Sequence, residues 1–159
     1  MKFTAKVRTC LWFDCKGEEA ARFYTSLLPD SEIEKVYKPD PTGPPLVVEF
    51  TLAGAPYMIL NGGPHYKQTP AASISVLTKD QKETDRLWAA LTADGGEESM
   101  CAWLTDKYGV SWQIVPERLV DLINDDDRTA AGRAQEAMMK MRKIDTAALE
   151  AAFNGEQGD

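Results

Sequence analysis

The residues best placed to do chemistry lie in the run Thr105–Pro116, in which Gly109 makes a turn and the following residues alternate in character. Successive residues of a strand face opposite sides of a sheet, so Gln113 faces away from a core that contains Trp112 and Ile114. An amide in that position can bind a polar ligand or a metal ion. It can equally form a hydrogen bond with a neighbouring hydroxyl group or a water molecule. Both interpretations make Gln113 the first candidate site residue.

A repeated pattern supplies counterparts for Gln113. An offset of 64 residues (87 − 23) aligns two expected helices, and it also lays Thr9–Phe13 on Ser73–Leu77. In the second of these strands Ile74 and Val76 form the apolar side that a helix should cover. The opposite sides of the two strands then carry four residues that we expect to face a ligand: Thr9, Leu11, Ser73 and Ser75.

The last strand of each half adds one more residue. Gly54 is followed four residues later by Met58, just as Gly109 is followed four residues later by Gln113. Curved sheets that lie side by side can enclose a trough of ligand size. The predicted ligand-binding residues are Thr9, Leu11, Met58, Ser73, Ser75 and Gln113.

The elements that position these residues follow the order β-α-β-β-β twice. Apolar periodicity and turn residues predict eight strands, over residues 7–14, 31–37, 46–52, 56–60, 72–78, 98–101, 103–104 and about 111–116. One helix is expected over 18–28, and another begins at Asp80 and ends before Gly95. Helices are then expected over 117–123, about 129–142 and 145–155, with 156–159 as a tail.

This pattern predicts an α+β fold. Paired βαβββ modules, about 1–64 and 65–116, form one domain over 1–116 with a curved, mostly antiparallel eight-stranded sheet. The C-terminal helices, 117–155, pack on this domain or on a partner subunit. A surface loop rich in proline is expected over 39–45.

The amino-acid composition narrows the range of expected binding partners and cellular locations. The formal net charge of −7 disfavours nucleic acid and anionic membranes, which are themselves negative. Because no run of about 18 apolar residues occurs, we expect neither a membrane span nor export. The cysteines are odd in number and lack the paired spacing of a zinc site, which favours reduced thiols in the cytoplasm. Cys10, within an apolar run, is expected to be an inert core thiol.

Several runs together resemble a known family: Leu11–Asp14, Glu18–Tyr24, Trp103–Pro116 and Met141–Asp145. They resemble the PhnB-like branch of the vicinal oxygen chelate superfamily, over nearly the whole chain. The resemblance implies paired βαβββ modules and a homodimer. It also implies kinship with glyoxalases, extradiol dioxygenases and antibiotic-resistance proteins, and some PhnB-like members carry the label 3-demethylubiquinone methyltransferase.

Enzymes of the superfamily hold one divalent metal ion through four inward His, Glu or Gln residues. The resemblance places those positions on Thr9, Met58, Ser73 and Gln113. A thioether, two hydroxyls and an amide do not hold a transition metal well, so we predict no metal and no other cofactor. His65, the only histidine, could converge with Glu49 or Cys10, although nothing in the spacing requires it.

Three functions are compatible with the sequence. The first is a metal-independent protein that binds a small organic molecule in the trough, with an unidentified reaction. The second is a non-catalytic protein of the bleomycin-resistance type that sequesters a drug or metabolite. The third, methyl transfer, lacks support because Asn61–Pro64 is not followed by the helix that a Gly-rich cofactor loop needs.

Overall fold

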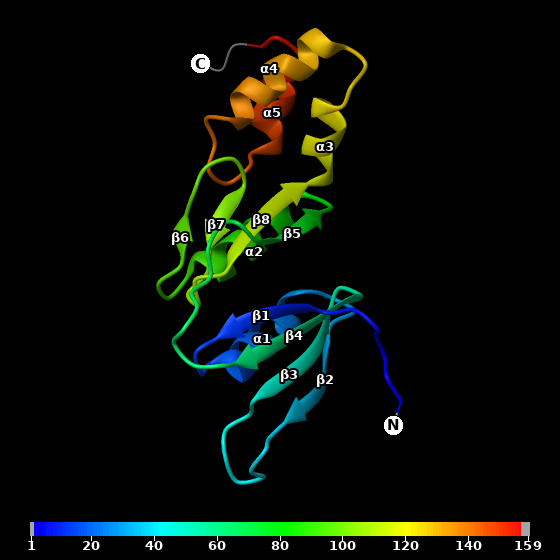
Figure 1. Ribbon diagram of the computed structural model, residues 1–159. Helices are drawn as coiled ribbons and strands as arrows, with labels where there is room; N and C mark the ends of the chain where they lie inside the picture. Colours follow the sequence, from blue (N-terminus) through cyan, green and yellow to red (C-terminus); the bar gives the residue numbers. More distant parts are fainter. Residues whose placement is uncertain (1, 157–159) are drawn as a thin grey trace. The chain divides into compact units, whose positions relative to one another are not determined.

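The computed structural model of the protein describes residues 2–156, which form two compact units that meet in sequence between Lys67 and Gln68 (Figure 1). Each unit contains one helix and four strands in the order β-α-β-β-β. In each sheet the first strand pairs in parallel with the last, and the two remaining pairings are antiparallel. The predicted α+β fold with paired βαβββ modules and C-terminal helices is confirmed, and its eight strands form two four-stranded sheets in place of the single eight-stranded sheet expected.

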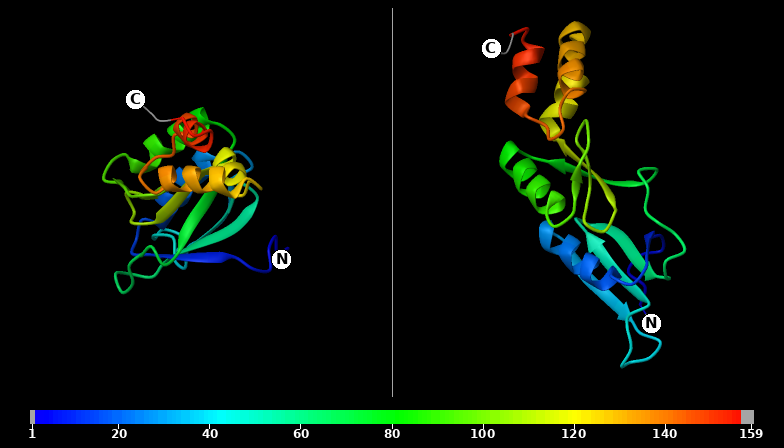
Figure 2. Two further views of the ribbon diagram at one scale, coloured as in Figure 1. Left: turned by 90° about the horizontal axis from the view of Figure 1, so that it is seen from above. Right: turned by 90° about the vertical axis from the view of Figure 1, so that its left-hand side faces the viewer.

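The first unit is a four-stranded sheet with one helix on one of its faces (Figure 2). Its elements are β1 (Thr9–Phe13), α1 (Gly17–Leu27), β2 (Glu32–Tyr37), β3 (Val47–Leu52) and β4 (Ala55–Asn61), in the spatial order β1-β4-β3-β2. The proline-rich loop predicted over 39–45 connects β2 to β3, because proline cannot donate to a strand ladder.

Close approach between α1 and the sheet depends on Gly17. A Cβ atom at this position would lie 2.2 Å from Ile59 Cγ2 and 2.6 Å from Asn61 Oδ1, so no larger residue fits without movement. The Asn61 side chain accepts a hydrogen bond from the Gly17 amide at 2.8 Å, which serves the start of the helix in place of a side-chain cap at Lys16. Ile59 thereby marks the helix-covered face of the sheet.

The second unit repeats this plan and adds three helices. Its elements are β5 (Ser73–Thr78), α2 (Gln81–Thr92), β6 (Glu97–Glu98), β7 (Trp103–Thr105), β8 (Ser111–Pro116), α3 (Glu117–Ile123), α4 (Arg128–Met138) and α5 (Thr146–Phe153), with the sheet order β5-β8-β7-β6. Asp80 caps α2 through a bond from the Glu83 amide, as the sequence predicted.

The turn between β7 and β8 is organised by Asp106, a carboxylate that is only 2% exposed. Its Oδ1 accepts from the amides of Tyr108 and Val110, at 2.8 and 3.1 Å, and its Oδ2 accepts from Trp112 Nε1 at 2.9 Å. These bonds fold the turn back on the strand that follows it. They also lock the Trp112 ring on the helix side, which sets the facing of Gln113.

Two predicted elements end three or four residues earlier than expected. The strand predicted over 98–101 stops at Glu98, because Cys101 and Ala102 both adopt positive φ (57° and 75°) in a tight turn. Their amides donate to the carbonyls of Met141 and Arg142. The helix predicted to reach Arg142 ends at Met138 for the same reason, since the segment that follows leaves the helix to receive those bonds.

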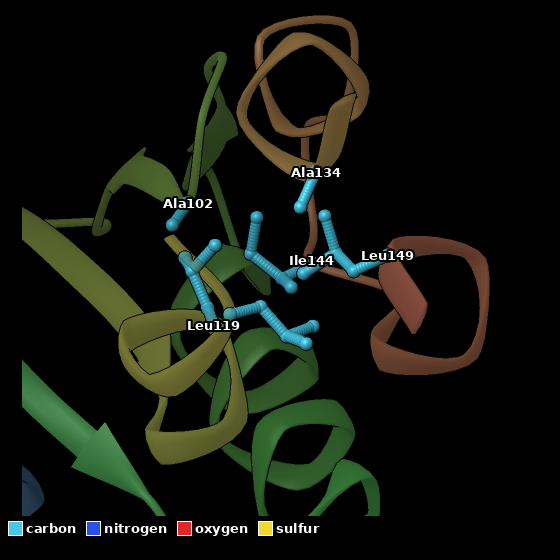
Figure 3. Close-up of a cluster of buried hydrophobic side chains, with 6 residues drawn as sticks. Ala102, Leu119, Ala134, Ile144 and Leu149 are labelled. Carbon is cyan, nitrogen blue, oxygen red and sulfur yellow. The ribbon is translucent and has the colours of Figure 1, made fainter. Parts of the chain in front are cut away.

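The C-terminal helices bury a cluster of apolar side chains in the second unit (Figure 3). Its buried members are Ala102, Leu119, Leu122, Ala134, Ile144 and Leu149. Ala102 comes from the β6–β7 turn, so the helices pack on their own unit. No helix among residues 2–156 is long and apolar enough to cross a membrane.

Candidate functional site

The candidate site lies on the open face of each sheet, by which we mean the face turned away from α1 or α2. In the second unit Ile74, Trp112 and Ile114 are buried on the helix side. Ser75 pairs with Gln113 across the parallel strands β5 and β8, so both side chains lie on the open face. The facing predicted for Ser73, Ser75 and Gln113 is therefore confirmed.

Gln113 has a partner on that face. Its Nε2 donates to Ser73 Oγ at 2.9 Å. Among the described residues the Gln113 side chain makes no other hydrogen bond, so its carbonyl oxygen is available to a ligand. The hydrogen bond fixes the amide in one orientation, with the acceptor directed away from Ser73.

The facing predicted for Thr9 and Leu11 is wrong. Leu11 pairs with Ile59 across β1 and β4, and it is 7% exposed among the core residues on the α1 side. Thr9 lies two residues before Leu11, so its side chain points to the same side of the sheet, and it is exposed at the start of the strand. The open face of β1 carries Cys10 and Trp12 instead.

The error comes from one extra residue in a loop. Three residues separate Phe13 from Gly17 in the first unit, whereas two separate Thr78 from Gln81 in the second. The offset is therefore 64 between the helices and 65 between the first strands (76 − 11). A shift of one residue moves every side chain of a strand to the opposite face.

With the corrected offset, Arg8 takes the place that Ser73 holds in the second unit (73 − 65). Its guanidinium reaches across the sheet and donates to the carbonyls of Tyr57 and Phe50, at 3.0 and 3.3 Å. It also donates to Glu34 Oε2 at 2.6 Å. Sequence reasoning missed Arg8, although its alternation with Cys10 and Trp12 was the available signal.

Glu34 completes this network at an irregularity in β2. It also accepts from the hydroxyls of Thr4 and Thr51, and its side chain is only 13% exposed. The hydrogen bond from Arg8 is the largest cause that lowers the pKa of Glu34 to about 2, and the same bond raises the pKa of Arg8. Both groups remain charged at neutral pH.

Beside this network the open face of the first sheet forms a cavity of about 290 Å³. It is lined by Lys35, Tyr37, Val47, Glu49 and Met58. Met58 is thus the one residue predicted for the first half that lies on the open face, and it contributes a flexible apolar wall. Lys35 and Glu49 pair across β2 and β3 and add charge of both signs.

Cys10 is exposed, contrary to the prediction of a core thiol. Its partner across β1 and β4 is Met58, so the thiol lies on the open face. Desolvation by neighbouring atoms raises the pKa of the Cys10 thiol. A protonated thiol is a weak nucleophile, which does not favour covalent catalysis at this position.

Comparison with known families identifies the chain. Residues 5–115 match the model of the family described as 3-demethylubiquinone-9 3-methyltransferase. The chain belongs to this family. Among the curated proteins, none matches it. The resemblance to PhnB-like proteins is confirmed.

Solved structures agree with this family. The Bacillus cereus PhnB protein, described as a 3-demethylubiquinone-9 3-methyltransferase, is 35% identical, with 70% of this chain and 99% of that chain covered and a TM-score of 0.64. Protein PA1353 from Pseudomonas aeruginosa is 22% identical, covers 72% of this chain and 98% of its own, and has a TM-score of 0.58. The fosfomycin resistance protein FosX from Listeria monocytogenes is 13% identical, with 72% and 94% covered and a TM-score of 0.53. The similarity to PA1353 and to FosX shows a shared fold alone.

The name of the family implies an adenosyl cofactor, and the residues do not fit one. In this family member the element that follows the glycine run after β4 is a strand, β5, and not a helix. The amides of Gly62 and Gly63 already donate to the carbonyls of Phe13 and Asp14. A backbone whose donors are engaged cannot cradle a cofactor at a strand-turn-helix.

A divalent metal fits no better. Within residues 2–156 no three His, Cys, Asp or Glu side chains converge as ligands. His65 lies exposed in the loop after β4. The open-face positions of the first and last strands hold Arg8, Met58, Ser73 and Gln113, and a guanidinium has no lone pair to give a metal ion.

Proposed function

We propose that the protein binds a small organic molecule at the open faces of its sheets and does so without a metal ion. The observation that carries this proposal is the cavity of about 290 Å³ beside Met58, on the face that the fold leaves uncovered by α1. Ligand sites in proteins occupy roughly 300–1,000 Å³, so this cavity suits a compact molecule or one part of a larger one.

The lining indicates what such a molecule should carry. Met58 and Val47 offer apolar contact, and Glu49 and Lys35 offer an acceptor and a donor. Taken by itself, the open face of the second unit offers the free carbonyl of Gln113 as an acceptor for a ligand that binds there. A mainly apolar molecule with a few polar groups matches these features.

A thermal-shift screen with aromatic and polar metabolites tests the proposal. A ligand present at 100 times its Kd raises the stability of the folded state by about 2.7 kcal/mol. Val47→Trp should fill the cavity and abolish the shift without loss of fold. Glu136→Gln, an exposed change on α4, is the matched control and should leave the shift unchanged. A ligand whose shift survives Val47→Trp binds elsewhere and contradicts the proposal.

Within this proposal, sequestration is favoured over catalysis by three ionisable groups of the open face, Arg8, Cys10 and Glu34. The pKa values of Arg8 and Cys10 are raised, and that of Glu34 is lowered to about 2. Each shift moves the pKa of its group further from neutral pH, whereas a general acid or base needs a pKa close to neutral pH. Recovery of an identified ligand unchanged after long incubation is the expected result, and its conversion would establish an enzyme.

We also propose a cytoplasmic homodimer. The three cysteines are free, as reduced thiols require. Exposed apolar side chains at Leu77, Val120 and Met139 offer surface for a second copy. Light scattering coupled to size-exclusion chromatography should give twice the chain mass, and a monomer would refute the dimer.

A further inference from the structure

The first unit contains another cavity, of about 300 Å³, that shares no lining residue with the cavity beside Met58. Its walls come from the loop between β1 and α1, the proline-rich loop between β2 and β3, and the end of β4. The lining residues are Asp14, Cys15, Pro39, Asp40, Pro44, Pro45, Leu46 and Asn61. Segments far apart in sequence therefore meet around one space.

Asn61 fixes these walls to each other. Its Nδ2 donates to the Pro45 carbonyl at 3.0 Å, and its backbone amide donates to the Leu46 carbonyl at 2.9 Å. Its Oδ1 accepts from Gly17 at 2.8 Å, just after the other loop. The cavity is thus held open by bonds that do not involve a ligand, which lowers the entropic cost of binding.

Each of the two loops contributes a carboxylate. Asp40 Oδ1 accepts from the amide and the hydroxyl of Thr42, both at 2.9 Å, and Oδ2 stays available. These bonds, the amide bond first, lower the pKa of Asp40. The Asp14 carboxylate has no hydrogen bond or ion pair with any residue from 2 to 156. Neither carboxylate has a Lys or Arg partner there.

The rest of the lining offers few donors. Proline has no N–H group, and a carboxylate only accepts. The amides of Leu46 and Asn61 already donate to Tyr37 and Leu46. The cavity therefore combines apolar walls with two acceptors of negative charge, so its complement is a positively charged donor on an apolar body.

We propose that this cavity is a second binding site, specific for a small primary amine in its ammonium form with an apolar ring or chain. The ammonium group bonds Asp14 and Asp40, and the apolar body lies against the prolines. This site is independent of the open-face function proposed above.

Cys15 allows a direct test, because it lines the cavity and is exposed. The full-length protein is treated with iodoacetamide, which is uncharged, and the labelling rate of each cysteine is followed by peptide mass spectrometry. A saturating concentration of benzylamine should slow the labelling of Cys15 at least about fivefold, while the labelling rates of Cys10 and Cys101 stay unchanged. Benzyl alcohol, of the same size without the charge, should not protect Cys15.

Matched variants test the two carboxylates. Asp14→Asn with Asp40→Asn should raise the half-protecting benzylamine concentration at least about tenfold, since one charge-assisted hydrogen bond typically accounts for that much. Asp121→Asn with Glu136→Gln changes the net charge equally at exposed positions and should have no effect. Equal protection by benzyl alcohol, no protection by benzylamine, or protection that is unchanged in the Asp14/Asp40 variant would overturn the proposal.

Discussion

The Arg8–Glu34 pair joins the segment before β1 to the far edge of the first sheet through side chains alone. Because both side chains are largely buried, with exposures of 9% and 13%, the pair is screened by salt less than a surface pair. Loss of Glu34 leaves Arg8 with only the more distant carboxylate of Glu49, at 4.0 Å, as a counter-charge.

We expect Glu34→Gln to reduce the free energy of unfolding by about 1 to 3 kcal/mol at pH 7. The pKa of Glu34 is lowered from 4.5 to about 2, so its contribution is complete above pH 4.5 and is lost as the pH falls toward 2. The difference from the wild type should therefore shrink over that window. Urea titrations at several pH values measure it, with Glu136→Gln as the control. A constant difference from pH 7 to pH 2.5 would contradict the assignment.

Asp106→Ala should cost about 2 to 4 kcal/mol, because two buried hydrogen bonds and one partly buried hydrogen bond are lost together. The amides of Tyr108 and Val110 and the indole of Trp112 would each lose their acceptor. Denaturant titrations of Asp106→Ala, Trp112→Phe and the double variant measure the coupling. Strictly additive effects would show that the Asp106–Trp112 bond does not stabilise the fold.

At the scale of elements, the two helical glycines Gly17 and Gly132 form a matched pair. Gly17→Ala places a methyl group 2.2 Å from Ile59 Cγ2, whereas Gly132→Ala meets nothing within 4 Å. We expect the first to destabilise by about 2 kcal/mol, through overpacking, and the second to stabilise by about 0.5–1 kcal/mol through helix propensity. Thermal unfolding measures both, and a loss of the same size at both sites would show that the contact with Ile59 is unimportant.

The elements were largely predictable from sequence because their signals are local. Asp80 and Glu83 mark the start of α2, and alternation in β8 separates Trp112 from Gln113. The tight turn at Cys101 and Ala102 was not predictable, because positive φ usually falls on glycine or asparagine. Its stability comes from Met141 and Arg142, which are distant in sequence.

The candidate site was half predictable. Ser73, Ser75 and Gln113 were placed correctly because Ile74 and Trp112 fix their strands. The first half failed because the helices and the strands need different offsets, and only pairing such as Leu11 with Ile59 reveals this. The cavity near Asn61 was also missed, since hydrogen bonds between distant loops leave no periodic pattern.

At the scale of the whole molecule, the absence of a bound metal remains a prediction. We expect the protein, after incubation with Mn²⁺, Fe²⁺ or Zn²⁺ and desalting in high salt, to retain well under about 0.1 equivalent. Plasma mass spectrometry measures the content. High salt matters because a net charge of −7 attracts divalent ions without a specific site. Close to one equivalent would contradict the prediction.

The extra residue between β1 and α1 also bears on how the two halves diverged. An inserted codon inside β1 would have turned its core residues to solvent, whereas in the loop it costs little. In the shorter loop Asp80 caps α2, whereas in the longer one Lys16 holds the capping position without a side-chain bond and Asn61 accepts from the first helical amide instead. A difference of one residue in this loop is thus enough to change which group caps the helix in one half while every strand residue keeps its face.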